Sequence, residues 1–117
     1  MQTSKRVVNK TLERQLAQTV FQLIADVKNT GNAESVLSSI LSPVELSTVI
    51  KRISIAYWLS KGRKYENIKN NLKVSSASVS EIQKQIHKPG WQLTLKYLSA
   101  DEWATIWEEK IKKFLPK

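Results

Sequence analysis

Two neighbouring segments of this chain have the spacing of short helices, and almost nothing separates them. Apolar residues recur in both at intervals of three and four: Tyr65, Ile68 and Leu72 in the first, and Val79, Ile82 and Ile86 in the second. Only Lys73-Val74 and Ser75, a residue type that caps helices, stand between the two segments. We predict a pair of short helices joined by a tight turn.

The rest of the chain follows the same helical spacing, and no segment alternates with period two. A long helix is predicted from residue 9 to 28, and Thr30-Gly31-Asn32 is typical of a helix end. A short helix follows, with apolar residues between Val36 and Leu41.

Start and stop signals bound the other predicted helices. Ser42-Pro43-Val44-Glu45 combines a capping serine, a first-turn proline and a capping-box glutamate, and it predicts a helix that ends at Gly62. Its expected core face comprises Leu46, Val49, Ile50, Ile53, Ala56, Tyr57 and Ser60. Lys88-Pro89-Gly90 predicts a break, and a capping box from Ser99 to Glu102 predicts a last helix bearing Trp103, Ile106, Trp107, Ile111 and Phe114. The expected fold is all-α with about six helices.

The length of 117 residues suits one compact unit. We expect a flexible basic arm at residues 1 to 8 and a single helical domain at residues 9 to 117. The Lys5-Arg6 pair in this arm has two interpretations, a contact to a polyanion and a disordered tail.

The formal net charge of +9 favours a polyanionic partner, either nucleic acid or an anionic surface. The sequence has no apolar run near the length of a membrane span, and its first residues lack the pattern of a secretory signal. We therefore expect a cytoplasmic, nucleoid-associated bacterial protein with no membrane partner.

Catalytic and metal-binding chemistry has little material in this sequence. There are no cysteines, and the single histidine, His87, is typical of a solvated residue near a helix end. The carboxylates show no catalytic spacing. We therefore expect no enzyme, no metal and no cofactor.

The helix pair at residues 64 to 88 has the spacing of a helix-turn-helix, in which the second helix presents its N-terminal end to the major groove of DNA. Ile68, Leu72, Val74 and Val79 would hold the pair together, and Ser75 would cap the second helix. The expected DNA contacts are Lys64, Lys69, Ser75, Ser76, Ala77, Ser78, Ser80 and Lys84. A helical hairpin without a DNA role is the alternative interpretation of the same spacing.

Lysines and arginines surround this pair, and they are either phosphate contacts or a solvated surface. They are Lys61, Arg63, Lys64, Lys69, Lys73, Lys84 and Lys88. Lys73 stands where many such turns have glycine, which predicts a strained or differently shaped turn. Glu81 on the second helix has three interpretations: a hydrogen bond from cytosine, repulsion of phosphate, or capping of a neighbouring arginine.

The order of these elements resembles the tryptophan-repressor superfamily, and looks closest to its YerC/YecD-like branch. The residues that carry the resemblance are Leu41-Ser42-Pro43, Lys51-Arg52-Ile53, Gly62, Ile68-Lys69-Asn70, Val74 to Ser80, and Gly90-Trp91-Gln92-Leu93. The resemblance covers about residues 36 to 98 and implies an all-helical homodimer with interlocked helices that binds a palindromic operator.

The resemblance also implies a place for a small-molecule effector, with Ser42, Arg52 and Glu81 as candidate contacts. In the tryptophan repressor two arginines hold the corepressor, and they align with Arg52 and Glu81 here. Because Glu81 reverses the charge, we expect no tryptophan corepressor and leave open an unknown effector. Arg52 is alternatively a structural ion-pair partner among apolar neighbours. The four tryptophans, Trp58, Trp91, Trp103 and Trp107, are expected in the core or a dimer interface rather than in a ligand cage.

These patterns predict a dimeric transcriptional regulator, a repressor that binds double-stranded DNA in a sequence-specific manner. A long first helix whose apolar stripe is too broad for so short a chain to bury supports the dimer. The alternative is a basic helical protein-interaction module that meets an acidic protein or a membrane surface. Positive charge on the same face as Ser75 to Ser80 favours DNA, and charge on another face favours the module.

Overall fold

The computed structural model describes residues 6–100 and 102–114, with backbone only at residues 102–105, 107 and 114. These residues form seven α-helices and no strands, so the predicted all-α class is confirmed. In chain order the helices are α1 (Lys10–Asp26), α2 (Thr30–Ile40), α3 (Pro43–Ser60), α4 (Tyr65–Leu72), α5 (Ser76–Gln85), α6 (Pro89–Ala100) and α7 (Glu102–Phe114). They divide into two compact units, one up to Ser42 and one from Pro43 onward. Whether residues 9 to 117 act as a single domain stays a prediction.

The helix α6 corrects the predicted count. Pro89-Gly90 was expected to break the chain, but Pro89 is the first residue of α6, where its missing N–H needs no partner. The backbone N–H of Gln92 donates to the Lys88 carbonyl at 3.0 Å, which closes the first turn. Ser99, expected as a cap, lies inside α6 instead.

The boundary between α1 and α2 also differs from the expectation. Thr30-Gly31-Asn32 does not end a helix but forms the first turn of α2, because the Asn29 side chain accepts a hydrogen bond from the Asn32 N–H at 2.8 Å. The helix α1 ends earlier, at Asp26. At its start, Asn9 caps it by accepting from the N–H groups of Thr11 and Leu12 at 2.9 and 3.3 Å.

The N-terminal unit has no buried residue in either of its helices. The apolar stripe predicted for the first helix comprises Leu12, Leu16, Val20, Phe21, Leu23, Ile24 and Val27. The six that lie in α1 are between 42% and 62% exposed, and Val27, just beyond its end, is half-buried. A folded chain rarely leaves so many large apolar residues on one helix in water. The apolar stripe of α1 therefore lies on the surface of the N-terminal unit.

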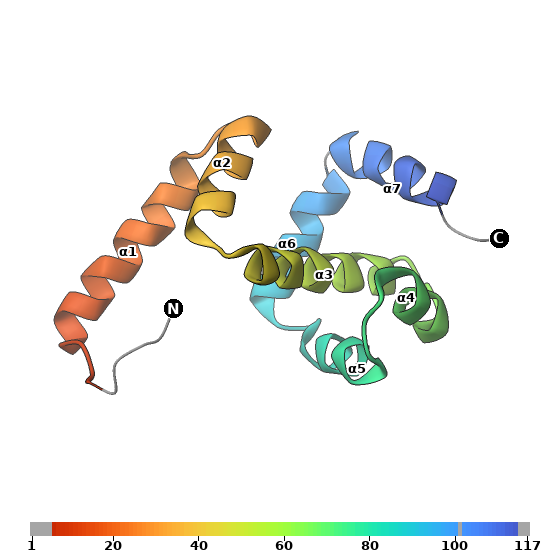
Figure 1. Cartoon of the computed structure of the whole chain (residues 1–117), viewed down its shortest axis with the longest axis horizontal. Helices are drawn as coiled ribbons and strands as arrows, with labels where there is room; N and C mark the ends of the chain where they lie inside the picture. The colour runs from red at the N-terminus through yellow and green to blue at the C-terminus, as the bar shows by residue number, and fades with distance from the viewer. Residues whose placement is uncertain (1–5, 101, 115–117) are drawn as a thin grey trace. The chain divides into compact units, whose positions relative to one another are not determined.

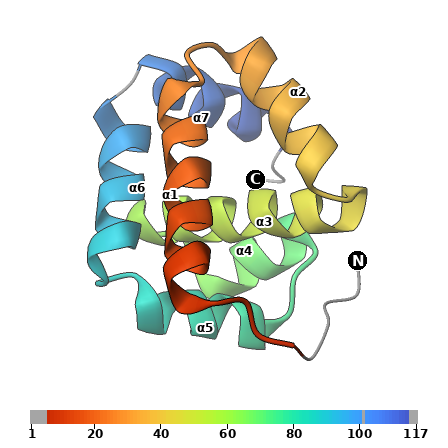
Figure 2. The ribbon, with the colours of Figure 1, turned by 90° about the vertical axis from the view of Figure 1, so that its left-hand side faces the viewer.

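The C-terminal unit is organised around α3. Helices α4 and α5 lie on one side of α3, and α7 lies on the other side, joined to α5 by α6 (Figures 1 and 2). Helices α4, α5 and α6 all contact α3, and α7 packs against α6. The residues of α3 are therefore surrounded by helices on several sides.

The core of this unit explains where the predicted face of α3 was wrong. Five consecutive residues of α3, from Ser54 to Trp58, are buried. The buried hydrophobic residues are Ile55, Ala56, Tyr57, Trp58, Ile68, Val79, Ile82, Ile86 and Leu95. Ile55 was missed, and Trp58 was expected in the core or a dimer interface but not as part of this face, whereas Ile50 is 54% exposed and Ser60 is exposed. A helix that is contacted on several sides loses the one-sided periodicity from which the face was predicted.

The aromatic residues divide between core and surface. Trp58 is buried in the core and Trp91 packs against it, in agreement with the prediction for these two. The side chains of Trp103 and Trp107 lie outside the described residues, as does that of Phe114. Tyr65 recurs with Ile68 and Leu72 along one face of α4 and was therefore predicted to be buried with them, but it is 43% exposed. In the described part of the chain, no helix has the length and apolar character that a membrane crossing requires.

Candidate nucleic-acid interface

The pair α4–α5 is locked by side chains that have no contact with water. Ile68 of α4 and Val79 of α5 are both 0% exposed, and Leu72 and Val74 pack partly buried against the same core. These are the four residues predicted to hold the pair together. Two helices anchored in this way keep a fixed angle, so the outer surface of α5 is presented rigidly.

The turn between the helices is as tight as predicted. Lys73 ends α4 in the left-handed conformation, with φ of 56° and ψ of 51°. The N–H groups of Lys73 and Val74 both donate to the Lys69 carbonyl, the second at 3.2 Å. Two N–H groups thus share one carbonyl acceptor, and a helix end of this form usually has glycine at the left-handed residue.

The serines at the start of α5 serve the helix itself. The Ser75 hydroxyl accepts from the Ser78 N–H at 3.1 Å, so Ser75 caps α5. The hydroxyls of Ser75 and Ser78 lie 3.0 Å apart. Both side chains are therefore occupied with the helix start, which leaves the exposed Ser76 and Ala77 to face a partner.

The outer face of α5 carries small and charged residues. Helical spacing places Ala77, Ser80, Glu81 and Lys84 opposite the buried Val79 and Ile82. Ala77, Glu81 and Lys84 are exposed and Ser80 is half-buried. Small residues near the N-terminal end allow close approach of the helix backbone to a partner surface.

The basic residues around the pair fall into two groups. Lys64, Lys73, Lys84 and Lys88 are exposed, and Lys69 is half-buried. Lys61 and Arg63 instead contact aromatic rings of the core, because the Lys61 Nζ lies 5.3 Å from the Tyr57 ring centroid and the Arg63 Cζ 4.7 Å from that of Trp58. Lys61 and Arg63 therefore make contacts that stabilise the fold.

A cavity of about 340 Å³ lies where α3 meets the turn and α5. Its lining comprises Thr48, Lys51, Arg52, Ile55, Lys73, Val74, Ser75, Ser78, Glu81 and Ile82. Two of the predicted effector contacts, Arg52 and Glu81, are thus brought together, whereas Ser42 belongs to the N-terminal unit. Thr48 and Lys51 were missed, although the spacing of residues 48, 51, 52 and 55 places them on one face of α3.

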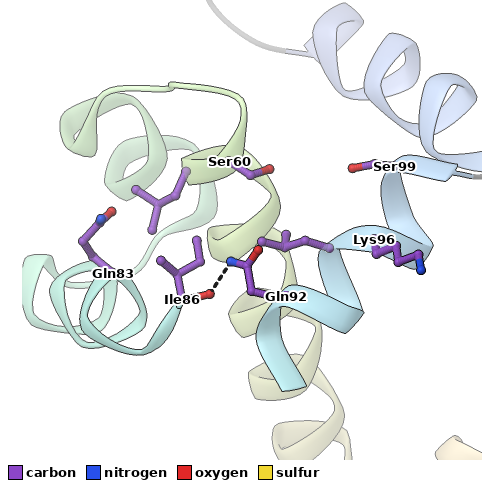
Figure 3. Close-up of a pocket in the computed structure, with 8 residues that line it drawn as sticks. Ser60, Gln83, Ile86, Gln92, Lys96 and Ser99 are labelled. Carbon is purple, nitrogen blue, oxygen red and sulfur yellow. Dashed lines mark hydrogen bonds between the residues drawn. The ribbon is translucent and has the colours of Figure 1, made fainter. Parts of the chain in front are cut away.

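A second, more open cavity of about 440 Å³ lies between α3, α5 and α6 (Figure 3). Gln92 reaches across from α6, and its Nε2 donates to the Ile86 carbonyl at 2.7 Å. This hydrogen bond connects the C-terminal end of α5 to α6 and so fixes the position of that end of α5. In the described ranges, no three histidine, cysteine, aspartate or glutamate residues gather as a metal site would require.

The buried contacts of α4 and α5, their tight turn and the capped, exposed start of α5 define a helix-turn-helix protein. A family model described as Trp repressor protein matches residues 15–98, well over half of the chain. The chain therefore belongs to the Trp repressor protein family, a family of helix-turn-helix regulators that bind DNA. The YerC/YecD-like branch stays a prediction. A search of curated proteins and a search of solved structures return no match.

Proposed function

We propose that this protein is a homodimeric transcriptional repressor that binds double-stranded DNA in a sequence-specific manner, with α5 in the major groove. The observation that carries the proposal is the rigid presentation of α5. Its inner residues Val79 and Ile82 are buried while Ser76 and Ala77 at its N-terminal end are exposed. In helix-turn-helix proteins this end of the second helix contacts the base edges.

The distribution of charge supports DNA over an acidic protein or a membrane surface. Residues 64 to 88 contain five lysines against two glutamates. Lys51, Arg52 and Lys73 line the same cavity as Ser75 and Ser78, at the N-terminal end of α5. Positive charge and the exposed helix end therefore share one region, the arrangement that a groove flanked by phosphates requires.

The exposed stripe of α1 supports the homodimer. Six large apolar side chains, each at least 42% exposed, gather on a helix without a buried residue. A second copy of the chain supplies an identical stripe, and pairing the two removes both from water. In such a dimer the two α5 helices would enter successive major grooves about 34 Å apart.

Contacts to DNA are proposed for the exposed residues Lys64, Ser76, Ala77 and Lys84, and for the half-buried Lys69 and Ser80. Ser75 and Ser78 are proposed to act through the N-terminal end of α5 that they cap, where free backbone N–H groups bind phosphate. An effector near Ser42, Arg52 and Glu81 stays a prediction, and the expectation of no tryptophan corepressor is unchanged.

The test is selection of enriched sites from a random-sequence duplex library at about 0.15 M salt, together with the solution mass of the protein. Enrichment of a two-fold-symmetric site by a protein of twice the chain mass is the expected result. Binding that is weak, sensitive to salt and without enrichment would overturn the proposal in favour of the interaction module. A reporter gene placed behind the enriched site then tests repression.

A further inference from the structure

Lys73 has a backbone conformation that its residue type does not favour. Among the described residues, only Lys73 and Gly62 have positive φ, at 56° and 79°. Glycine adopts this region freely, whereas a side chain on Cβ meets the neighbouring carbonyl there. One of the two positions has glycine, as this conformation favours. The presence of lysine instead of glycine at the other position, residue 73, therefore needs an explanation.

The side chain of Lys73 makes no contact that explains its presence by a stabilising role in the described part of the fold. It is exposed, and within the described ranges no hydrogen bond or ion pair involves its amine. What the fold uses is the backbone of this residue, because its N–H donates to Lys69 and its carbonyl accepts from the Lys51 Nζ at 3.4 Å. Glycine would make both bonds without the steric cost.

The position of Lys73 indicates what the side chain is for. Lys73 lies two residues before Ser75, the N-terminal cap of α5. It is therefore next to the N-terminal end of α5, the helix proposed to enter the major groove. A side chain there stands beside the groove wall, where the phosphates lie. Lys51 and Arg52 line the same cavity together with one carboxylate, Glu81, so the charge around this turn is net positive.

We propose that Lys73 binds a backbone phosphate beside the groove that α5 enters, and that Lys51 positions the turn through the Lys73 carbonyl. The inference rests on the proposed DNA binding and deepens it by adding a phosphate contact. It explains the strain, since strained residues persist at sites where function needs them.

The test compares the wild-type protein, Lys73→Gly and Lys73→Arg on one random-sequence duplex of about 30 base pairs, between about 0.05 and 0.2 M salt. Lys73→Gly is expected to melt at the same temperature as wild type or higher, because it removes the steric cost. Each subunit of the dimer loses one phosphate contact, so the affinity at 0.15 M salt is expected to fall about 30-fold and the salt slope by about 1.8, twice the contribution of a single contact. Lys73→Arg keeps the charge and is expected to bind as wild type.

Lys110→Ala, an exposed lysine of α7 outside the motif, is the control for loss of one charge. An equal fall in affinity for Lys110→Ala and Lys73→Gly would overturn the proposal, since general charge would then account for both. An unchanged affinity and slope for Lys73→Gly would also overturn it while leaving the proposed function intact. A wild-type protein that does not bind the duplex would overturn the proposed function as well.

Discussion

Arg63 contacts Trp58 twice, through its backbone and through its side chain. Its N–H donates to the Trp58 carbonyl at 3.1 Å, and its guanidinium lies over the indole ring with 4.7 Å between Cζ and the ring centroid. The side chain also donates to Asn67 Oδ1 of α4 at 3.3 Å. One residue of the α3–α4 connection thus joins the buried tryptophan to the first helix of the α4–α5 pair.

We expect Arg63→Ala to lower the free energy of unfolding by about 1 kcal/mol, the size of one cation–π contact with a side-chain hydrogen bond. Chemical denaturation measures the change. Lys61→Ala is the matched control, because Lys61 is exposed and lies farther from its ring, at 5.3 Å, so a smaller loss is expected. Equal losses for the two variants would contradict a specific role for Arg63.

Removal of the cap on α5 should loosen the start of that helix. Ser75→Ala deletes the acceptor for the Ser78 N–H and is expected to cost about 1 kcal/mol. Hydrogen exchange at the Ser78 amide reports the change locally. Ser75→Asp should restore protection because aspartate is a good cap. Ser76→Ala changes the next serine, which is exposed, and should leave exchange at Ser78 as it is in wild type.

The lock between α4 and α5 should respond to the volume of Ile68. Because Ile68 is 0% exposed, Ile68→Val is expected to cost about 1 kcal/mol and Ile68→Ala about 2–5 kcal/mol in unfolding free energy. Thermal melts of the two variants give the series. A loss for Ile68→Ala no larger than that for Ile68→Val would mean that the two helices are not held by this side chain.

The stripe of α1 should decide the oligomeric state. Val20→Glu places a charge in the middle of the exposed stripe and is expected to weaken self-association at least about 30-fold. Analytical ultracentrifugation over a concentration series measures the association. Gln18→Glu adds the same charge on the opposite face of α1, because a residue two positions before Val20 points to the other side of the helix. This variant should associate as wild type. Equal association of the two variants would exclude the stripe as the dimer interface.

Glu81 should weaken binding to DNA of arbitrary sequence. It is exposed on α5, the helix proposed to enter the groove, where a carboxylate would be repelled by the phosphates. Because the dimer carries this charge twice, Glu81→Gln is expected to raise affinity for a random duplex about 30-fold, about five-fold for each charge at 0.15 M salt. Glu109→Gln on α7 is the control and should change affinity less. Comparison of the DNA sites selected by the wild-type protein and by Glu81→Gln tests whether Glu81 also accepts a hydrogen bond from cytosine. In that case a preference for cytosine would be present in the wild type and absent in Glu81→Gln.

Those features that depend on neighbours in the sequence were predictable. The bounds of α4 and the cap of α5 follow from local signals, since apolar spacing fixes the first and Ser75 the second. The unusual turn at Lys73 was expected for the same reason. Even the mistake at Pro89 was local, because the signal for a proline at the first helical position was present and was interpreted as a break.

Those features that depend on packing were not predictable. Ile55 is buried because α4, α5 and α6 contact α3, and no periodicity within α3 reports that. Thr48 and Lys51 join the cavity with Glu81 only through the contact of α3 with α5. The hydrogen bond from Gln92 to Ile86 likewise depends on α6, a helix that the sequence did not predict.

The absence of buried residues in α1 has a consequence for how the protein would respond to its own abundance. Most of the stability of a helix in a protein comes from tertiary packing of its apolar face, and α1 buries no residue, so α1 alone is only marginally stable in water. If a second chain covers the stripe, folding of α1 and association are one equilibrium, and both follow protein concentration. At low copy number the C-terminal unit would stay folded while α1 frayed, and the paired geometry for two successive grooves would be lost. Occupancy of an operator would then rise with a power of the protein concentration, so that small changes in expression switch it steeply.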